Sequence, residues 1–429
     1  MNREPRTPNP EPRTVRTSPR RIVVIGAGAA GTMAAIFAAA AGVETVLVER
    51  TADGGRKILI SGGGRCNILP ARLDESRFVS DAPAHLVRRF VRSWPLREQI
   101  AFFERELGLP LVEEVASAKL FPASQRARDV RDRLLDLARR HGTRLLMNTT
   151  VTGFAPDDGR WRVDVRGAAP LHADALVVAT GGLSVPSTGS DGAGLGIVER
   201  LGHAVRPAYP ALTPLIANPA PFAALSGISL PVTITARADG LSSTAAGGFL
   251  FTHHGYSGPA VLDVSHVAVR SRAEAMDDAV ITVRWTARGD EEWTAILKPQ
   301  GSRTVLTAVA GEIPTRLAEA LIEAAGLDPR LPLAHLGRAD RLRLVGILVR
   351  GVLPWTGDEG YKKAEVTGGG VYLTEIDPRT MESRKHKGLF LCGELLDVFG
   401  PIGGYNFLWA WATGRAAGIG ASATIKGLA

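Results

Sequence analysis

The chain has 429 residues, 45% of them hydrophobic, a formal net charge of +8 and two cysteines. This length and composition allow more than one hydrophobic core, so we expect two or three domains. Two distant cysteines without a CxxC spacing argue against a disulfide framework or a dithiol redox centre. The chain shows neither a membrane-spanning apolar run nor the apolar centre of a signal peptide, so we expect a cytoplasmic protein.

Half of the net positive charge lies at the start of the chain. Residues 1–21 hold six Arg and two Glu, and they are rich in Pro with few apolar residues. This composition predicts that residues 1–20 form a disordered basic tail. Aromatic residues that could stack on bases do not occur among these arginines, so a solvated tail is a simpler explanation than a nucleic-acid-binding arm.

The first segment with a chemical signature predicts a strand, a glycine turn and a helix. The turn reads Gly26-Ala-Gly-Ala-Ala-Gly31. Gly26 would make the tight turn after the strand, Gly28 would let a pyrophosphate approach the backbone, and Gly31 would let the helix pack closely on the sheet. The free N–H groups and the positive dipole end of the helix would then face the phosphates.

A second predicted strand ends at Glu49, eighteen residues after Gly31. A carboxylate at this point can accept hydrogen bonds from both ribose hydroxyls of an adenosine, and it disfavours a 2′-phosphate. The pattern therefore predicts FAD or NAD rather than NADP. The residues expected to bind this half of the cofactor are Gly26, Gly28, Ala29, Ala30, Gly31, Glu49 and Arg50.

Residues 54–67 form a loop with five glycines and three basic side chains. Glycine admits positive φ and exposes backbone N–H groups, while basic side chains can pair with phosphates. We expect this loop to contact the cofactor through Arg56, Lys57, Gly62, Gly63, Gly64, Arg65, Cys66 and Asn67. No second cysteine lies nearby in the sequence, so Cys66 is interpreted as a packed residue rather than a catalytic thiol.

The middle of the chain changes character. Residues 173–182 predict a buried strand that ends in Ala-Thr-Gly, with Thr180 and Gly181 beside the cofactor. Strand-rich runs between residues 211 and 285 then predict a small antiparallel barrel, and helical patterns follow it. Asp191-Gly-Ala-Gly-Leu-Gly196 does not follow an apolar strand. We interpret it as a helix N-terminal turn and expect a single dinucleotide site.

The last third of the chain predicts the other half of the site. A strand over residues 387–392 leads into Gly393-Glu394, where an acidic side chain can bond to the ribityl hydroxyls of a flavin. Gly403-Gly-Tyr-Asn406 then opens a helix whose N-terminus would stabilise the negative charge of a reduced flavin. The residues expected to bind FAD here are Gly393, Glu394, Gly403, Gly404, Tyr405 and Asn406.

Taken in order along the chain, these segments resemble the BaiN/YhiN-type NAD(P)/FAD-dependent oxidoreductases. The most specific blocks are Gly62-Gly-Gly-Arg-Cys-Asn67 and Gly403-Gly-Tyr-Asn406; the others are Ala118-Lys-Leu-Phe-Pro122, Phe251-Thr-His-His-Gly-Tyr-Ser-Gly-Pro259 and Val366-Thr-Gly-Gly-Gly-Val371. Phe399 and Leu408 depart from the family pattern beside the expected flavin edge, so a substrate is not transferred from the family.

The resemblance implies an α/β fold with a FAD-binding Rossmann-type domain of the two-dinucleotide-domain kind, interrupted by a β-barrel and a helical cap. The expected divisions are the tail at 1–20, the FAD-binding domain at 21–205 and 353–429, the barrel at 206–290 and 335–352, and the helical insert at 291–334.

The leading functional hypothesis is a FAD-dependent oxidoreductase that takes hydride from NADH or NADPH and delivers it to a small, enone-like acceptor. A flavin-dependent amine or alcohol oxidase that uses oxygen is one alternative. A tRNA-modifying or otherwise nucleic-acid-bound flavoprotein is another, motivated by the pI near 9.8.

The expected partner is a small-molecule substrate, without membrane or nucleic acid, and the oligomeric state stays open. His253 and Tyr256, in a turn that also holds His254, are candidate general acids that could protonate a substrate carbon. No His or carboxylate cluster has metal-ligand spacing, so no metal is expected.

Overall fold

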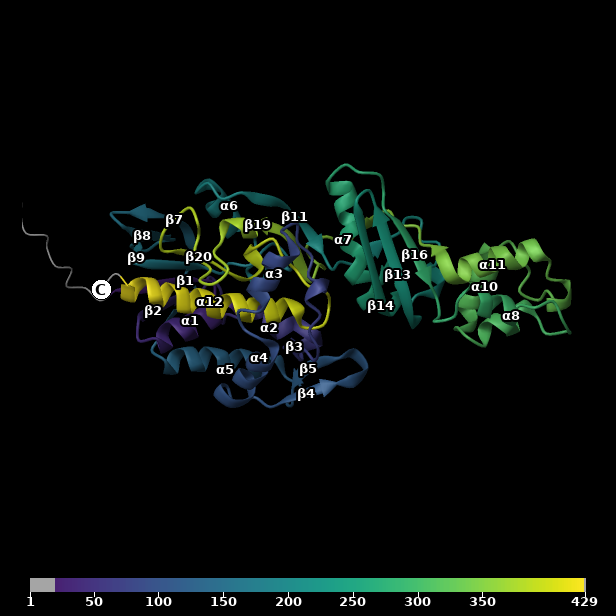
Figure 1. The fold of residues 1–429 in the computed structure, drawn as a ribbon, viewed down its shortest axis with the longest axis horizontal. Helices are drawn as coiled ribbons and strands as arrows, with labels where there is room; N and C mark the ends of the chain where they lie inside the picture. Colours follow the sequence, from purple (N-terminus) through teal and green to yellow (C-terminus); the bar gives the residue numbers. More distant parts are fainter. Residues whose placement is uncertain (1–19, 428–429) are drawn as a thin grey trace, which may run out of the picture.

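The structure is a computed structural model that describes residues 20–427. The disordered tail expected at residues 1–20 therefore lies, except for Arg20, outside the described residues. Three regions follow one another along the long axis of the described chain (Figure 1). A layered α/β region comes first, an antiparallel sheet with one long helix lies in the middle, and a group of short helices lies at the far end.

The α/β region is built on a five-stranded sheet in which all neighbouring strands are parallel. In order across the sheet the strands are β20 (Leu389–Leu391), β10 (Ala175–Val178), β1 (Arg21–Ile25), β2 (Glu44–Val48) and β6 (Arg144–Leu146). The first three are nearly continuous apolar runs, as expected for a parallel sheet covered on both faces. This confirms the expected α/β class with a Rossmann-type sheet.

Two helices from opposite ends of the chain pack against each other beside this sheet. They are α1 (Ala29–Ala40) and α12 (Tyr405–Gly427). A Cβ atom at Gly414 would lie 2.2 Å from the carbonyl oxygen of Ala30, and one at Gly418 would lie 2.3 Å from that of Ala34. The two backbones are therefore in direct contact. Because both contacts advance in the same direction, the helices run parallel and their N-termini point the same way.

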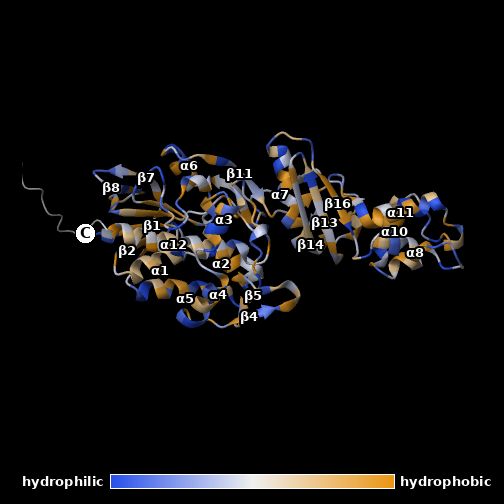
Figure 2. Cartoon of the chain, in the orientation of Figure 1, coloured by the Kyte–Doolittle hydropathy of each residue, from blue (hydrophilic) through white to orange (hydrophobic). Residues whose placement is uncertain are grey.

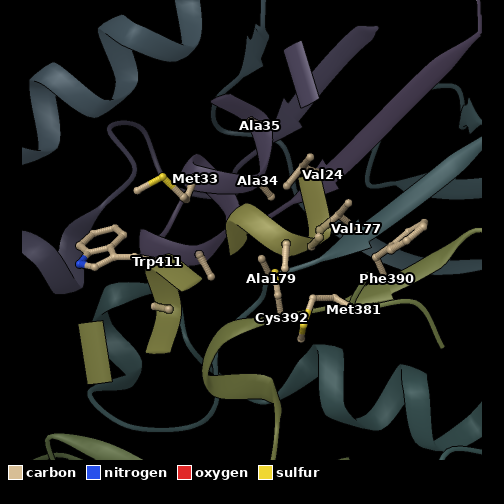
Figure 3. Close-up of a cluster of buried hydrophobic side chains, with 14 of the residues drawn as sticks. Val24, Met33, Ala34, Ala35, Val177, Ala179, Met381, Phe390, Cys392 and Trp411 are labelled. Carbon is tan, nitrogen blue, oxygen red and sulfur yellow. The ribbon is translucent and has the colours of Figure 1, made fainter. Parts of the chain in front are cut away.

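Side chains from the sheet and both helices form one hydrophobic core. Figure 3 shows Val24 of β1, Met33 of α1, Val177 of β10, Phe390 of β20 and Trp411 of α12 in this cluster, and all five are fully buried. Helix α5 (Ala127–Arg140) packs beside α1. Figure 2 shows hydrophobic and hydrophilic residues mixed along α5, as expected for a helix that buries one face.

Smaller elements surround the parallel sheet. One antiparallel sheet consists of β3 (Leu69–Pro70), β5 (Lys119–Pro122) and β4 (Leu111–Glu114), and another of β7 (Val151–Asp157), β8 (Arg160–Val165) and β9 (Leu171–Ala173). The remaining helices of this region are α2 (Arg56–Ile60), α3 (Ala84–Val91), α4 (Leu96–Ala101) and α6 (Ala193–Arg200).

The inserted region joins the α/β region through two antiparallel strands, β11 (Val205–Ala211) and β19 (Val366–Val371). Its sheet has the strand order β17 (Gly351–Val352), β16 (Val280–Arg284), β13 (Ser229–Ala238), β14 (Leu241–Phe251), β15 (Gly255–Ser257), β12 (Leu215–Ile216) and β18 (Gly357–Asp358). Helix α7 (Pro259–Ala273) packs on β13 and β14. This sheet lies where the sequence predicts a barrel.

The far end of the insertion is helical. Its helices are α8 (Asp290–Ile296), α9 (Val305–Ala310), α10 (Thr315–Ala324) and α11 (Arg338–Arg350). The sequence assigned residues 335–352 to the barrel, but in the structure most of this segment is α11 and only β17 joins the sheet. Leu344, Val345 and Leu348 give α11 a buried apolar face against its neighbours, which explains the difference. Among residues 20–427, no helix has the length and apolar character needed to cross a membrane.

The backbone contact between α1 and α12 generates a prediction. Gly418→Ala would force the helices apart, and we expect it to destabilise the protein by about 1–3 kcal/mol. Gly346→Ala in α11 is the matched control, because a Cβ there meets nothing within 4 Å. The control should stabilise by about 0.5–1 kcal/mol through the helix propensity of Ala. Thermal unfolding measures both, and equal stabilisation by the two substitutions would disprove the close contact.

Candidate active site

The N-termini of α1 and α12 both open into one cavity of about 330 Å³. Residues from the two ends of the chain, from the loop after β2 and from the segment after β10 line it together. The residues that the sequence predicts for the cofactor and that line this cavity are Gly26, Gly28, Ala29, Ala30, Glu49, Arg50, Arg56, Lys57, Gly62, Arg65, Asn67, Thr180, Gly181, Gly393, Glu394, Gly403, Gly404 and Asn406.

The three glycines of the first turn have three different surroundings. Gly26 has a φ of +100°, and its Cβ would lie 2.5 Å from the carbonyl oxygen of Ala179. A Cβ at Gly31 would lie 1.8 Å from the carbonyl oxygen of Gly26, so this glycine permits helix packing. A Cβ at Gly28 meets nothing within 4 Å and Gly28 lines the cavity, so its open face can receive a ligand.

Glu49 ends β2 and is 8% exposed. Its Oε2 accepts a hydrogen bond from the Ala27 amide at 2.8 Å, and its Oε1 accepts from the amide and the hydroxyl of Thr51, each at 2.8 Å. A carboxylate offers about four acceptor positions, so one stays open for a ribose hydroxyl. Arg50 forms an ion pair with Asp191 at 2.5 Å, which brings the loop before α6 to the same end of the cavity.

The segment that begins at Asp191 leads directly into α6. The Oδ1 atom of Asp191 accepts a hydrogen bond from the amide of Ala193, at the start of that helix, at 3.2 Å. Burial raises the pKa of this carboxyl, but the bonds from Arg50 and Ala193 outweigh burial and hold the pKa below its usual value. The segment is a helix N-terminal turn, as the sequence analysis interpreted it.

The other end of the cavity contains a buried polar network. Lys57 Nζ donates to Glu394 Oε2 and to Ser184 Oγ, both at 2.6 Å. Glu394 Oε1 accepts from Ser184 Oγ at 2.6 Å and from the Thr367 amide at 2.9 Å. Lys57 was expected to pair with phosphates, whereas here its charge is compensated by Glu394. The network connects α2, the segment after β10, β19 and the turn that follows β20.

Two asparagines fix the turn that precedes α12. With its amide oriented to satisfy both neighbours, Asn67 accepts a hydrogen bond from the Gly404 amide at 3.0 Å and donates to the carbonyl of Leu69 at 3.2 Å. Asn406 accepts from the Gly400 amide at 2.8 Å and donates to the Gly400 carbonyl at 2.9 Å. These bonds hold the start of α12 against the glycine loop.

Five of the residues predicted to bind the cofactor do not line the cavity: Gly31, Gly63, Gly64, Cys66 and Tyr405. Gly63 and Gly64 are exposed. Cys66 is fully buried, and burial raises the pKa of its thiol to about 12, so the thiol stays protonated at neutral pH. Tyr405 is 4% exposed, and its hydroxyl accepts a hydrogen bond from the Asp74 amide at 3.2 Å.

The candidate general acids lie in the inserted region, and the structure does not bring them to the cavity. His253 and His254 are exposed in the turn before β15. Tyr256 points into the core of the inserted sheet, where it is 1% exposed and packs on Phe249 and Phe251. Burial raises the pKa of its hydroxyl.

The structure also brings residues to the site that the sequence analysis did not single out. Lys119, Phe121 and Glu365 line the cavity, and Ser184 and Thr367 complete the network around Glu394. Lys119 and Phe121 belong to a block that carries the family resemblance, so that block was the available signal. Glu365 lies just before another such block, and its residue type alone gave no signal.

The cavity fits FAD. Two helix N-termini point into it, and such termini bind anions through free N–H groups and the helix dipole. The open face of Gly28 leaves room for a pyrophosphate. Thr180, another residue of the cavity wall, has an Oγ1 atom that is buried without a hydrogen-bond partner.

Comparisons with known proteins agree with this fold. The family described as HI0933-like protein Rossmann domain matches residues 20–420. The chain is 32% identical over 405 residues to the ribosomal RNA dihydrouridine synthase of Escherichia coli K12, covering 91% of this chain and 95% of that one. It is 29% identical over 412 residues to the 3-dehydro-bile acid delta(4,6)-reductase of Clostridium scindens, covering 94% and 99%. The 3-ketosteroid-delta4-(5alpha)-dehydrogenase structure from Rhodococcus jostii RHA1 has a TM-score of 0.47 and 15% identity, covering 95% and 98%.

The different surroundings of Gly28 and Gly31 predict that one substitution affects cofactor binding and the other affects folding. Gly28 has φ −77° and ψ −169°, which any residue can adopt, so Gly28→Val should fold normally but fill the pyrophosphate space. We expect a folded protein that purifies without FAD. Gly31→Val, three residues away, should instead destabilise the fold through overpacking by about 1–3 kcal/mol or more. Flavin absorbance and thermal unfolding distinguish the two variants. Full FAD occupancy in Gly28→Val would contradict the assignment of Gly28 to pyrophosphate binding.

The ion pair of Lys57 and Glu394 generates a second prediction. Their side chains are 26% and 18% exposed, so Lys57→Met should leave a largely buried carboxylate without its cation. We expect a loss of about 1–3 kcal/mol, typical of hydrogen bonds to charged groups. Arg56→Met removes the neighbouring, more exposed pair with Asp53 and should cost about 0–1 kcal/mol. Urea denaturation compares them, and equal losses would argue against a special role for the Lys57 network.

Proposed function

This chain belongs to the family of HI0933-like Rossmann flavoproteins, the BaiN/YhiN type, and is a FAD-dependent oxidoreductase. From this premise we propose that it reduces a carbon–carbon double bond that is conjugated to a carbonyl group. The electrons come from NADH or NADPH and pass through FAD. The observation that supports the proposal is the convergence of two helix N-termini on one cavity, in which we expect both the dinucleotide and an acceptor to bind.

The names of two relatives support this reaction class. Dihydrouridine differs from uridine by two hydrogens across a ring double bond that is conjugated to a carbonyl. A delta(4,6)-reductase of a 3-dehydro bile acid is named for reduction of double bonds conjugated to the 3-oxo group. Both names describe hydride addition to an electron-poor alkene, which matches the enone-like acceptor expected from the sequence.

Each part of the cavity would have a separate task. The start of α1 would hold the pyrophosphate and Glu49 a ribose hydroxyl. Bound FAD would supply the hydride transfer. The N-terminus of α12 would stabilise the negative charge of the reduced ring. The sequence offers one dinucleotide motif, so the nicotinamide donor and the acceptor would occupy the flavin face in turn.

We propose a uracil base of ribosomal RNA as the acceptor, which is the nucleic-acid alternative of the sequence analysis and replaces the expectation of a small-molecule substrate. The relative from Escherichia coli is named for this substrate and is 32% identical. Residues 56–145, which include two walls of the cavity, hold 18 Lys and Arg against 11 Asp and Glu, whereas residues 206–352 hold 14 against 13. The excess of basic residues therefore lies in a segment of the FAD-binding region. There, the Arg65 guanidinium lies 4.2 Å from the centre of the Phe121 ring, which is 2% exposed. The partly exposed guanidinium plane is therefore the surface on which a base would stack.

The test separates electron donor from acceptor. Purified holoprotein is reduced anaerobically with NADH or NADPH, and ribosomal RNA or a conjugated ketosteroid is then added. We expect RNA to reoxidise the flavin, with dihydrouridine detected by mass spectrometry of the RNA. Reoxidation by the ketosteroid alone would keep the reaction class and change the substrate. Reoxidation by oxygen alone, after reduction by an amine or alcohol, would favour the oxidase alternative.

A further inference from the structure

Two charged residues of the cavity differ from all the others. Five cationic side chains line it among the described residues, and Arg50, Arg56, Lys57 and Arg65 each form an ion pair with a carboxylate. Lys119 is paired through its backbone in the sheet of β3, β5 and β4, but its side chain makes no hydrogen bond or ion pair with any described residue. The cavity therefore contains one cation whose charge is not matched by a contacting partner.

One of the acidic residues that line the cavity also differs from the others in its contacts. Glu49, Asp191 and Glu394 are held by the hydrogen bonds and ion pairs described above. The fourth acidic residue of the cavity wall is Glu365, which is exposed. Its backbone amide donates to the Leu212 carbonyl, but its side chain makes neither kind of contact with a described residue. A binding-site carboxylate without a protein partner is free to contact a ligand.

Both residues lie at the α12 end of the cavity. The Cε of Lys119 lies 3.9 Å from the position of a Cβ at Gly403, directly before α12. Glu365 is followed by β19, whose Thr367 amide bonds to Glu394. Lys57 and Lys119 are the cations whose fields act on Glu365. The acid and the free cation thus flank the region where the flavin ring would lie, away from Glu49.

The proposed reaction needs two groups at this place. When hydride adds to the β-carbon of a conjugated carbonyl, negative charge moves to the carbonyl oxygen and the α-carbon must receive a proton. Desolvation by the cavity walls raises the pKa of Glu365 against the opposing fields of Lys57 and Lys119. A carboxyl with a raised pKa keeps a protonated fraction closer to neutral pH, as a general acid requires.

We propose that Glu365 is the catalytic acid and that Lys119 binds the carbonyl oxygen of the acceptor, an inference that rests on the proposed function. Bound, reduced FAD would supply the hydride that adds to the β-carbon, and the flavin would be left oxidised. Glu365 gives its proton to the α-carbon, the double bond becomes a single bond, and solvent reprotonates the carboxylate. The side chain of Lys119 binds the carbonyl oxygen and offsets the negative charge that develops there.

The test measures the two half-reactions separately in holoprotein by anaerobic stopped flow. Glu365→Gln should slow reoxidation of the reduced flavin by the acceptor about a hundredfold or more. Flavin reduction by NADH or NADPH should slow far less. Reoxidation by ferricyanide, which needs no proton on carbon, should stay near the wild-type rate. Exposed Glu113→Gln and Lys298→Met are matched controls for the two charge removals.

The pH profile distinguishes an acid from a structural residue. The wild-type reoxidation rate should fall as pH rises through the pKa of Glu365, and this fall should vanish in Glu365→Gln. Lys119→Met should raise the KM for the acceptor and weaken binding of 4-nitrophenolate, an enolate mimic, about tenfold. The phenolate titration follows the absorbance of the probe and needs no turnover.

The outcomes separate the two proposals. If wild-type reduced enzyme transfers hydride to no conjugated carbonyl, the proposed function fails. If wild type transfers hydride and Glu365→Gln does so at the same rate and with the same pH profile, the acid assignment fails. Unchanged phenolate binding in Lys119→Met would overturn the role of Lys119.

Discussion

The backbone contact between α1 and α12 is the constraint on which the rest of the site depends. Gly414 and Gly418 remove the side chains that would otherwise separate the helices from Ala30 and Ala34. The contact joins the first and last helices of the described chain and directs both N-termini into one cavity. A binding site for one cofactor is thereby assembled from segments that are separated by almost the whole sequence and by the entire insertion.

The polar contacts of the cavity form a second layer that presupposes this packing. Lys57 can meet Glu394, and Asn67 can meet Gly404, only when the two ends of the FAD-binding domain lie side by side. Most charges of the cavity are neutralised within the protein, which keeps a partly buried region from holding uncompensated ions. Against that background the unmatched side chains of Glu365 and Lys119 stand out as groups reserved for a ligand.

The sequence predicted the parts of the site that depend on short spacing. The glycine turn and Glu49 lie within one strand–helix–strand unit, so their geometry follows from local order. Lys57 was predicted at the cavity, but its pairing with Glu394 depends on a contact between residues 337 positions apart, which periodicity does not reveal. Tyr256 was predicted as an acid from its residue type and its place in a turn, whereas in the structure it belongs to β15 and is buried in the core of the inserted sheet. The sequence near Glu365 gave no indication of a role, because the role proposed for it depends on residues that are close in space but distant in the sequence.

The parallel register of the two helices also sets a length. The matched positions, Gly414 with Ala30 and Gly418 with Ala34, place the first residue of α12 eight residues behind the first residue of α1 along the shared direction. At 1.5 Å per residue this offset is roughly 12 Å, and sliding to the next equivalent match would change it by a whole turn of roughly 5.4 Å. The small residues at the contact therefore allow the offset between the two helices to change only by whole turns. The span of a ligand that can bridge both positive helix ends is encoded in glycines that never touch it.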